Sequence, residues 1–111
     1  MRRMLWRWLD EAGATRAQGE DLALAASEAC ANAIEHAYGP APGLLEVSAS
    51  ISPAGEAVVA VRDFGSWRAP RGKNRGRGLM LMQGLTDSVD VVQRDEGTTV
   101  QLRRLLGADA R

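Results

Sequence analysis

The chain has 111 residues, which is enough for one domain and leaves little length for a second. Hydrophobic residues make up 45% and charged residues 25%, a globular composition that excludes a disordered tail or a collagen-like repeat. Fourteen basic side chains balance fourteen acidic ones, so the chain lacks the basic surplus that bulk nucleic-acid binding needs. The sequence shows neither a membrane span nor a signal peptide, and we expect a cytoplasmic protein.

Two helices are predicted in the first third of the chain. Apolar residues recur at helical spacing over residues 2–12, and Gly13 is placed to end that helix. Thr15 then begins a second helix, with Gln18 three residues later in the spacing of a capping box. This helix is predicted to run to Tyr38, where a Gly-Pro pair follows that cannot continue it.

The rest of the chain is predicted to form two hairpins around an irregular loop. Alternating apolar and polar residues predict a hairpin over 44–62, and residues 64–78 are rich in Gly, Pro and Arg without periodicity. A short apolar helix is expected over 79–85, followed by strands over 88–94 and 98–105. Hairpins and helices that are segregated in this way indicate an α+β two-layer sandwich and exclude a doubly wound dinucleotide fold.

The second helix carries a polar stripe. Glu28, Asn32 and Glu35 are spaced by four and three residues, so they share one helix face. An ordinary solvated face would explain this spacing. The functional interpretation is that an Asn oxygen, a hard ligand suited to Mg²⁺, lies in a cleft beside a carboxylate that can act as a base. The single cysteine, Cys30, lies in an alanine-rich run and is expected to be a small core residue.

Three further segments combine a polar group with glycine. Asp63 ends a strand two residues before Gly65, which suits a carboxylate that accepts from an exocyclic amine such as that of adenine. Gly76 and Gly78 directly precede the short helix in a basic loop, an arrangement that suits a phosphate. Thr98 opens the last strand after a glycine. Taken singly, these segments are equally explained by a turn, a flexible loop and a hairpin.

The order of these segments resembles one known family. Residues 28–38 (EACANAIEHAY) resemble the N box of the GHKL ATPase superfamily, and 63–65 is similar to its first glycine box. Residues 76–79 resemble the second glycine box, and 97–98 the terminal Gly-Thr motif. Within the superfamily, the N box is most similar to that of the anti-sigma-factor serine kinases of the RsbW and SpoIIAB type. The resemblance covers residues 15–105.

The resemblance implies a Bergerat ATP-binding fold, a mixed and mostly antiparallel sheet with helices on one face. It implies ATP and Mg²⁺ as cofactors, with Asn32 coordinating the ion and Glu28 acting as the general base. Asp63 would then accept a hydrogen bond from the adenine amino group. Gly65 would allow close approach to the nucleotide, and Thr98 would support the aspartate through a hydroxyl or a water.

The same resemblance assigns the remaining glycines and the partners. Gly76 and Gly78 would cradle phosphates, and residues 66–77 would form a lid over ATP. The implied reaction transfers the γ-phosphoryl group of ATP to a serine of a STAS-domain anti-sigma antagonist, and the implied second partner is a sigma factor, sequestered by partner switching. No nucleic acid or membrane is expected to bind directly. The alternative is a non-catalytic ATP-binding regulatory module, such as one from a multidomain phosphatase regulator.

One departure from the family concerns the start of the chain. Residues 1–111 are expected to form a single domain that begins at the first helix, without the N-terminal strand that members of this family usually carry. That strand commonly takes part in sheet completion and dimerisation in the family. Its absence leaves homodimerisation of this chain open.

Overall fold

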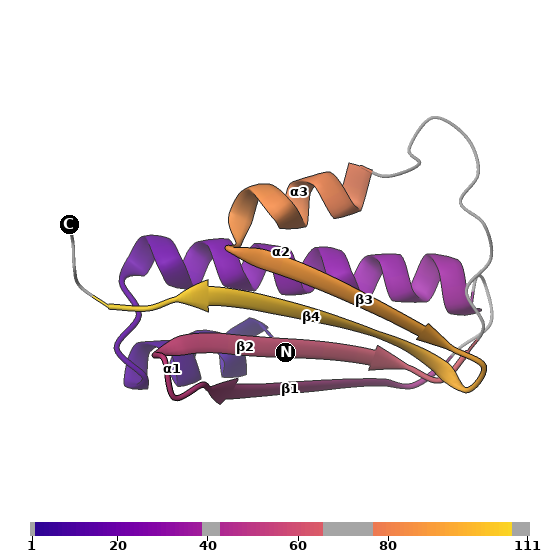
Figure 1. Cartoon of the computed structure of the whole chain (residues 1–111), viewed down its shortest axis with the longest axis horizontal. Helices are drawn as coiled ribbons and strands as arrows, with labels where there is room; N and C mark the ends of the chain where they lie inside the picture. Colours follow the sequence, from indigo (N-terminus) through magenta and orange to yellow (C-terminus); the bar gives the residue numbers. More distant parts are fainter. Residues whose placement is uncertain (1, 39–42, 66–76, 108–111) are drawn as a thin grey trace.

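The computed structural model describes residues 2–38, 43–65 and 77–107. Figure 1 shows a four-stranded sheet with the helices packed against one of its faces. The elements in chain order are α1 (Arg2–Glu11), α2 (Arg16–Ala33), a π-helical turn η1 (Ile34–Tyr38), β1 (Leu45–Ile51), β2 (Glu56–Asp63), α3 (Arg77–Leu85), β3 (Ser88–Arg94) and β4 (Gly97–Leu105).

The junction between α1 and α2 follows the sequence prediction. Gly13 adopts a φ of +94°, a conformation that glycine reaches without strain and that lets the chain turn after α1. The capping box is present: the Thr15 amide donates to Gln18 Oε1 at 2.8 Å, and the Gln18 amide donates to Thr15 Oγ1 at 3.2 Å. These two bonds satisfy amides that the first turn of α2 leaves without helical partners.

The end of the long helix differs from the prediction in geometry. The α-helical part stops at Ala33, and Ile34–Tyr38 continue the helix as a π-helical turn. The predicted extent to Tyr38 is confirmed, but a continuous α-helix is wrong. Apolar spacing predicts that a segment is helical, and it does not distinguish a few residues of π-helix from α-helix. Such turns are frequent at functional sites.

The sheet has the strand order β1-β2-β4-β3, and its three pairings are all antiparallel. Both predicted hairpins are therefore confirmed, as is the α+β class. No parallel pair, which a mixed sheet would contain, occurs among the described strands. β2 extends one residue beyond its predicted end, to Asp63, and β4 begins one residue early, at Gly97. Asp63 and Gly97 are therefore both part of the sheet, at the end where β2 and β4 meet.

The core lies between α2 and the inner face of the sheet. Ala25, Ala26 and Ala29 on α2 are fully buried, and their small side chains let the helix approach the strands closely. α1 adds apolar side chains to the same core. The buried residues that carry it are Leu5, Leu9, Leu22, Ala25, Ala26, Ala29, Ala57, Val59, Val61, Met82, Val100 and Leu102. None of the helices within the described ranges is long and apolar enough to cross a membrane.

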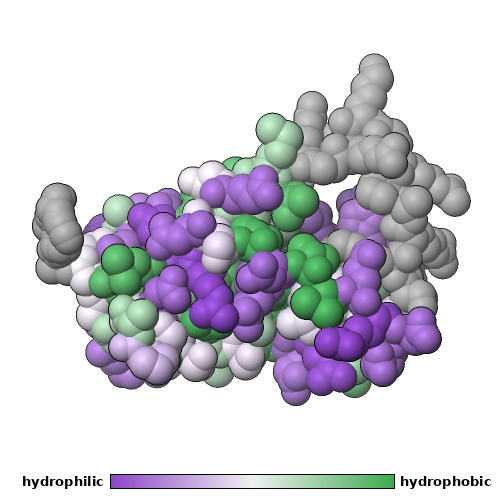
Figure 2. All heavy atoms as spheres, in the orientation of Figure 1, coloured by the Kyte–Doolittle hydropathy of each residue, from purple (hydrophilic) through white to green (hydrophobic). Residues whose placement is uncertain are grey.

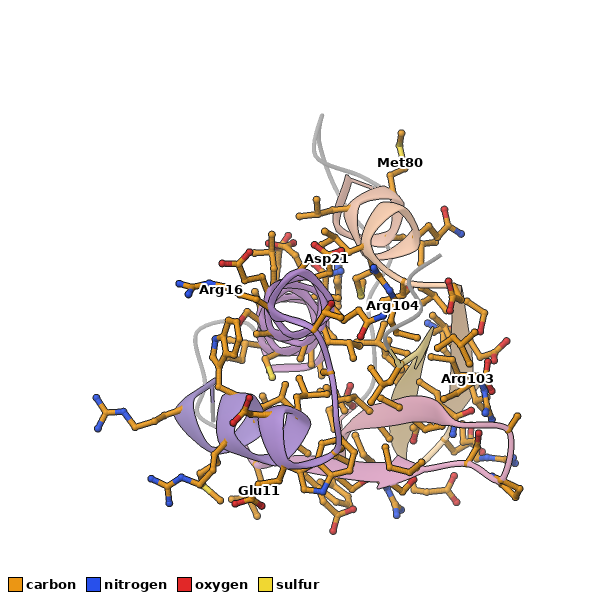
Figure 3. The ribbon with its side chains drawn as sticks, turned by 90° about the vertical axis from the view of Figure 1, so that its left-hand side faces the viewer. Glu11, Arg16, Asp21, Met80, Arg103 and Arg104 are labelled. Atoms are coloured by element: carbon orange, nitrogen blue, oxygen red, sulfur yellow. The ribbon has the colours of Figure 1, made fainter. Side chains whose placement is uncertain are left out.

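A partly buried arginine fixes the C-terminal end of α3. Arg104 Nη1 donates to Asp21 Oδ2 at 2.8 Å and to the Leu85 carbonyl at 2.7 Å, so one guanidinium joins β4, α2 and α3. Figure 3 shows Asp21 and Arg104 facing each other at this junction, while Met80 points away from the molecule. α3 begins two residues earlier than predicted, which places Gly78 in its first turn.

Candidate functional site

One end of the molecule gathers polar residues from four elements. The C-terminal end of α2, the end of β2, the start of β4 and the N-terminal end of α3 all lie on the right in Figure 1. Because β2 and β4 are antiparallel, the last residues of one strand pair with the first residues of the other, as Arg62 does with Thr99. The predicted site residues of these four elements are thereby brought to the same end of the sheet.

Asp63 forms the inner part of this site. Its residue is 1% exposed, and its Oδ1 accepts hydrogen bonds from the amides of Gly65 at 3.1 Å and Thr98 at 3.2 Å. These backbone donors fix the orientation of a buried carboxylate. The resemblance implied support from the Thr98 hydroxyl or a water, and the structure shows that the Thr98 amide is one donor to this carboxylate.

Gly97 has a structural role at the site that the sequence analysis did not assign. Its φ is +151°, and a methyl group added to it would overlap the Asp63 carbonyl and come within 3.1 Å of the Phe64 Cα. The missing side chain lets β4 lie directly against the end of β2. The available signal in the sequence was the glycine that directly precedes Thr98.

Asn32 faces the start of α3. Its carboxamide packs so closely on Gly78 that a methyl group at Gly78 would lie 2.7 Å from Asn32 Oδ1. Asn32 is half-buried on α2, and Gly78 lies in the first turn of α3. The first-turn amides of a helix have no helical partners and favour anions. The structure therefore places an amide oxygen beside a helix start.

A cavity of about 320 Å³ opens beside these residues. Its walls are mostly apolar, and its lining is Asn32, Leu79, Met82, Val91, Gln93 and Val100. Thr98 pairs with Gln93 and precedes Val100 by two residues on the same face of β4. The Asp63–Thr98 pair thus adjoins a cavity whose size and apolar walls suit a flat aromatic ring.

Sequence reasoning missed most of this lining. Met82 follows Gly78 by one helical turn, and Val91 and Gln93 alternate along β3, so a weak signal was present. These spacings are also those of ordinary core residues. Residues that line a cavity can be told from core residues only once the position of α3 relative to the sheet is known.

Glu28 lies one helical turn before Asn32 on the same face of α2 and is half-buried. Glu35, the third member of the predicted stripe, lies in the π-helical turn and is exposed. Asn32 is the member of the stripe whose close approach to α3 the structure records, and Glu28 shares its helix face. Gly76 and residues 66–76 of the predicted lid lie outside the described residues.

Among the described residues of the site, the Asn32 carboxamide is an oxygen ligand that suits Mg²⁺. Among the described residues, no three His, Cys, Asp or Glu side chains come together as a metal site. Mg²⁺ often takes one or two protein ligands and completes its shell with waters and substrate phosphates. Asn32 beside the glycine-containing start of α3 fits this mode of binding.

Cys30 packs against the core, as predicted for a small core residue. It is half-buried, and burial raises the pKa of its thiol. The neutral thiol therefore predominates near neutral pH, which suits a packing role rather than a reactive one.

The fold and the site define a class of nucleotide-binding α+β domains, and comparison with known proteins gives the family. The model of the histidine kinase-like ATPase domain family matches residues 1–104. The chain belongs to this family, as the resemblance to the GHKL superfamily had indicated.

The similar proteins include an anti-sigma factor. The anti-sigma F factor of Heyndrickxia coagulans is 33% identical over 95 residues, covering 72% of this chain and 65% of the relative. A structure of the RsbU and RsbW domains of Rv1364c from Mycobacterium tuberculosis matches with a TM-score of 0.77 at 28% identity. It covers 99% of this chain but only 29% of that one. The chain thus spans less than two thirds of these relatives.

A sensor kinase shares the fold at lower identity. The blue-light activated histidine kinase EL346 of Erythrobacter litoralis matches with a TM-score of 0.66 at 23% identity, covering 84% of this chain and 32% of that chain. This likeness concerns the fold alone. Taken together, the family model and these two relatives place the chain among the histidine kinase-like ATPase domains, a family that it shares with proteins named as an anti-sigma factor and as an RsbW domain.

Proposed function

We propose that this chain is a Mg²⁺- and ATP-dependent protein serine kinase of the cytoplasm that also acts as an anti-sigma factor. Its substrate would be a serine of a STAS-domain anti-sigma antagonist, and its second partner a sigma factor. The anti-sigma F factor and the RsbW domain among its relatives support this choice.

The observation that carries the ATP part is the buried Asp63 carboxylate beside an apolar cavity. A carboxylate fixed by two backbone amides is a suitable acceptor for the adenine amino group, and the walls from Met82 and Val100 suit the ring. Gly97 keeps the end of β2 and the start of β4 in contact, and Gly65 supplies one of the two amides.

The proposed binding of the ATP phosphates and Mg²⁺ depends on Asn32 and the start of α3. Asn32 would coordinate Mg²⁺, and the first-turn amides of α3 at Gly78 would lie near the phosphates. Gly76 is proposed for the same role from its motif. When bound, ATP supplies the phosphoryl group and Mg²⁺ neutralises charge that develops on its oxygens.

Glu28 is proposed as the general base. Its carboxylate would take the proton of the substrate serine hydroxyl as that oxygen forms its bond to the γ-phosphorus and ADP leaves with the bridging oxygen. Its half-buried place on the Asn32 face of α2, one helical turn from Asn32, supports this role.

The test is phosphotransfer from γ-labelled ATP to STAS-domain proteins of the same organism. We expect Glu28→Ala to reduce labelling of the serine at least about 100-fold, because a positioned base contributes on that order, with ATP binding retained. Glu35→Ala on the exposed π-helical turn is the matched control and should leave labelling unchanged. ATP binding without labelling of any STAS protein by the wild type would instead favour the non-catalytic regulatory module.

A further inference from the structure

A second pocket, with a polar lining, lies on the opposite face of the sheet. It has a volume of about 270 Å³ and is lined by Arg62, Arg94, Glu96, Gly97 and Thr99. Because side chains alternate along a strand, Arg62 and Thr99 point away from the helices when their neighbours Asp63 and Thr98 point inward. Figure 2 shows hydrophilic residues gathered over the β3–β4 turn at this end of the molecule.

The strand register brings two arginines to either side of β4. Arg62 on β2 pairs with Thr99, and Arg94 on β3 pairs with Gly97. The two guanidinium groups thus flank a strand that offers a hydroxyl at one position and no side chain at the other. Gly97 therefore contributes only backbone atoms to the lining of the pocket.

Among the described residues, these two arginines form no ion pair, whereas a third arginine on the same face does. Arg103 lies 3.5 Å from a Glu56 oxygen and donates to Gln101 at 3.1 Å. No ion pair of Arg62 or Arg94 occurs within the part of the chain that the structure describes.

Arg62 is nevertheless held in place. Its guanidinium carbon lies 4.8 Å from the centre of the Phe64 ring, a cation–π contact that uses none of its N–H donors. Arg62, Arg94 and Glu96 are exposed, and together they give the lining a net charge of +1. A single carboxylate would neutralise it.

We propose that this pocket binds the carboxylate of an aspartate or glutamate side chain presented by an acidic segment of a partner protein. The arginine forks match a carboxylate geometrically, and the Thr99 hydroxyl can add one donor. The proposal does not rest on ATP binding or kinase activity, because its charged groups lie on the face of the sheet opposite the cavity.

The test titrates the ¹⁵N-labelled chain with a capped peptide that carries one central glutamate between glycines and alanines. We expect saturable shifts of the Arg62 and Arg94 Nε–H signals and of the Thr99 amide, weakened by added salt. The same peptide with glutamine in place of glutamate should cause no shift. Arg94→Gln and Arg62→Gln should each weaken binding about tenfold, the loss expected for one charged hydrogen bond.

Arg103→Gln is the matched control, because Arg103 lies on the same face but is paired with Glu56. It should leave binding of the glutamate peptide unchanged, and circular dichroism should show all three variants folded. The proposal is wrong if the glutamate peptide produces no saturable shifts, or if Arg103→Gln weakens binding as much as Arg94→Gln does. Shifts with a phosphoserine peptide alone would also overturn the assignment to a carboxylate.

Discussion

The close contact between Gly97 and the Asp63 backbone makes position 97 intolerant of any side chain. The added methyl would meet backbone atoms of Asp63 and Phe64, which cannot move without separating β2 from β4. The φ of +151° adds backbone strain for any other residue. The same contact holds the Asp63 carboxylate beside the cavity, so both stability and the geometry of the proposed ligand site depend on one glycine.

We therefore expect Gly97→Ala to lower the free energy of unfolding by at least about 2 kcal/mol, measured by urea unfolding. Gly84→Ala is the matched control, because Gly84 lies on exposed α3 and a methyl there would meet no atom within 4 Å. That control should stabilise the chain by roughly 0.5–1 kcal/mol through helix propensity. Unfolding of Gly97→Ala at the wild-type urea midpoint would contradict the contact described here.

At the scale of the element, α3 determines the shape of the candidate site. Its first turn covers Asn32, and its buried Met82 forms part of the cavity wall. Its C-terminal end is held by Arg104, which joins Leu85 to Asp21. A change at Arg104 is therefore expected to alter the position of α3 without touching the cavity.

Arg104→Gln should lower the stability of the chain by about 1–3 kcal/mol, because both charge-assisted hydrogen bonds are lost in a partly buried setting. Thermal unfolding would show this as a decrease in Tm. Arg16→Gln provides the control: its ion pair with Glu20 at 3.6 Å is exposed, and such pairs contribute little. Equal decreases in the two variants would show that Arg104 does not hold α3.

Most element boundaries were predictable because they depend on local signals. The capping box at Thr15, the glycine turn after α1 and the alternation along β1 are each visible in a few adjacent residues. The π-helical turn was not, because apolar spacing is nearly the same for both helix types. The start of α3 was placed two residues late, since Arg77 and Gly78 carry no apolar signal.

The candidate site was predictable only in part. Asp63, Asn32 and Gly78 were singled out by their positions in the sequence. Asp63 ends a strand, Asn32 lies on a polar helix face, and Gly78 precedes the short helix. Met82 and Gln93 were missed, because the cavity that they line arises when α3 packs over β3, a contact between distant segments. The hydrogen bond from the Thr98 amide to Asp63 was not predictable from residue types, because every residue except proline has a backbone amide.

At the scale of the whole molecule, the two faces of the sheet carry two different candidate sites. The inner face combines the core with the cavity beside Asp63, and the outer face carries the arginine pocket at the same end of the strands. β2 and β4 contribute neighbouring residues to both. A domain built this way can hold a nucleotide on one face and a protein partner on the other.

The central claim is that the cavity beside Asp63 and Asn32 binds Mg²⁺-ATP. Thermal unfolding with and without this ligand tests it most directly. At ~100 times its dissociation constant, the ligand should add roughly 2.7 kcal/mol. For a domain of this size, that corresponds to a rise in Tm on the order of 10 °C.

Asn32→Ala serves as the comparison, with its own unfolding curve without ligand as the reference. The account predicts a large rise for the wild type that needs Mg²⁺ and is lost in Asn32→Ala. An unchanged Tm of the wild type, or an equal rise in Asn32→Ala, would contradict it.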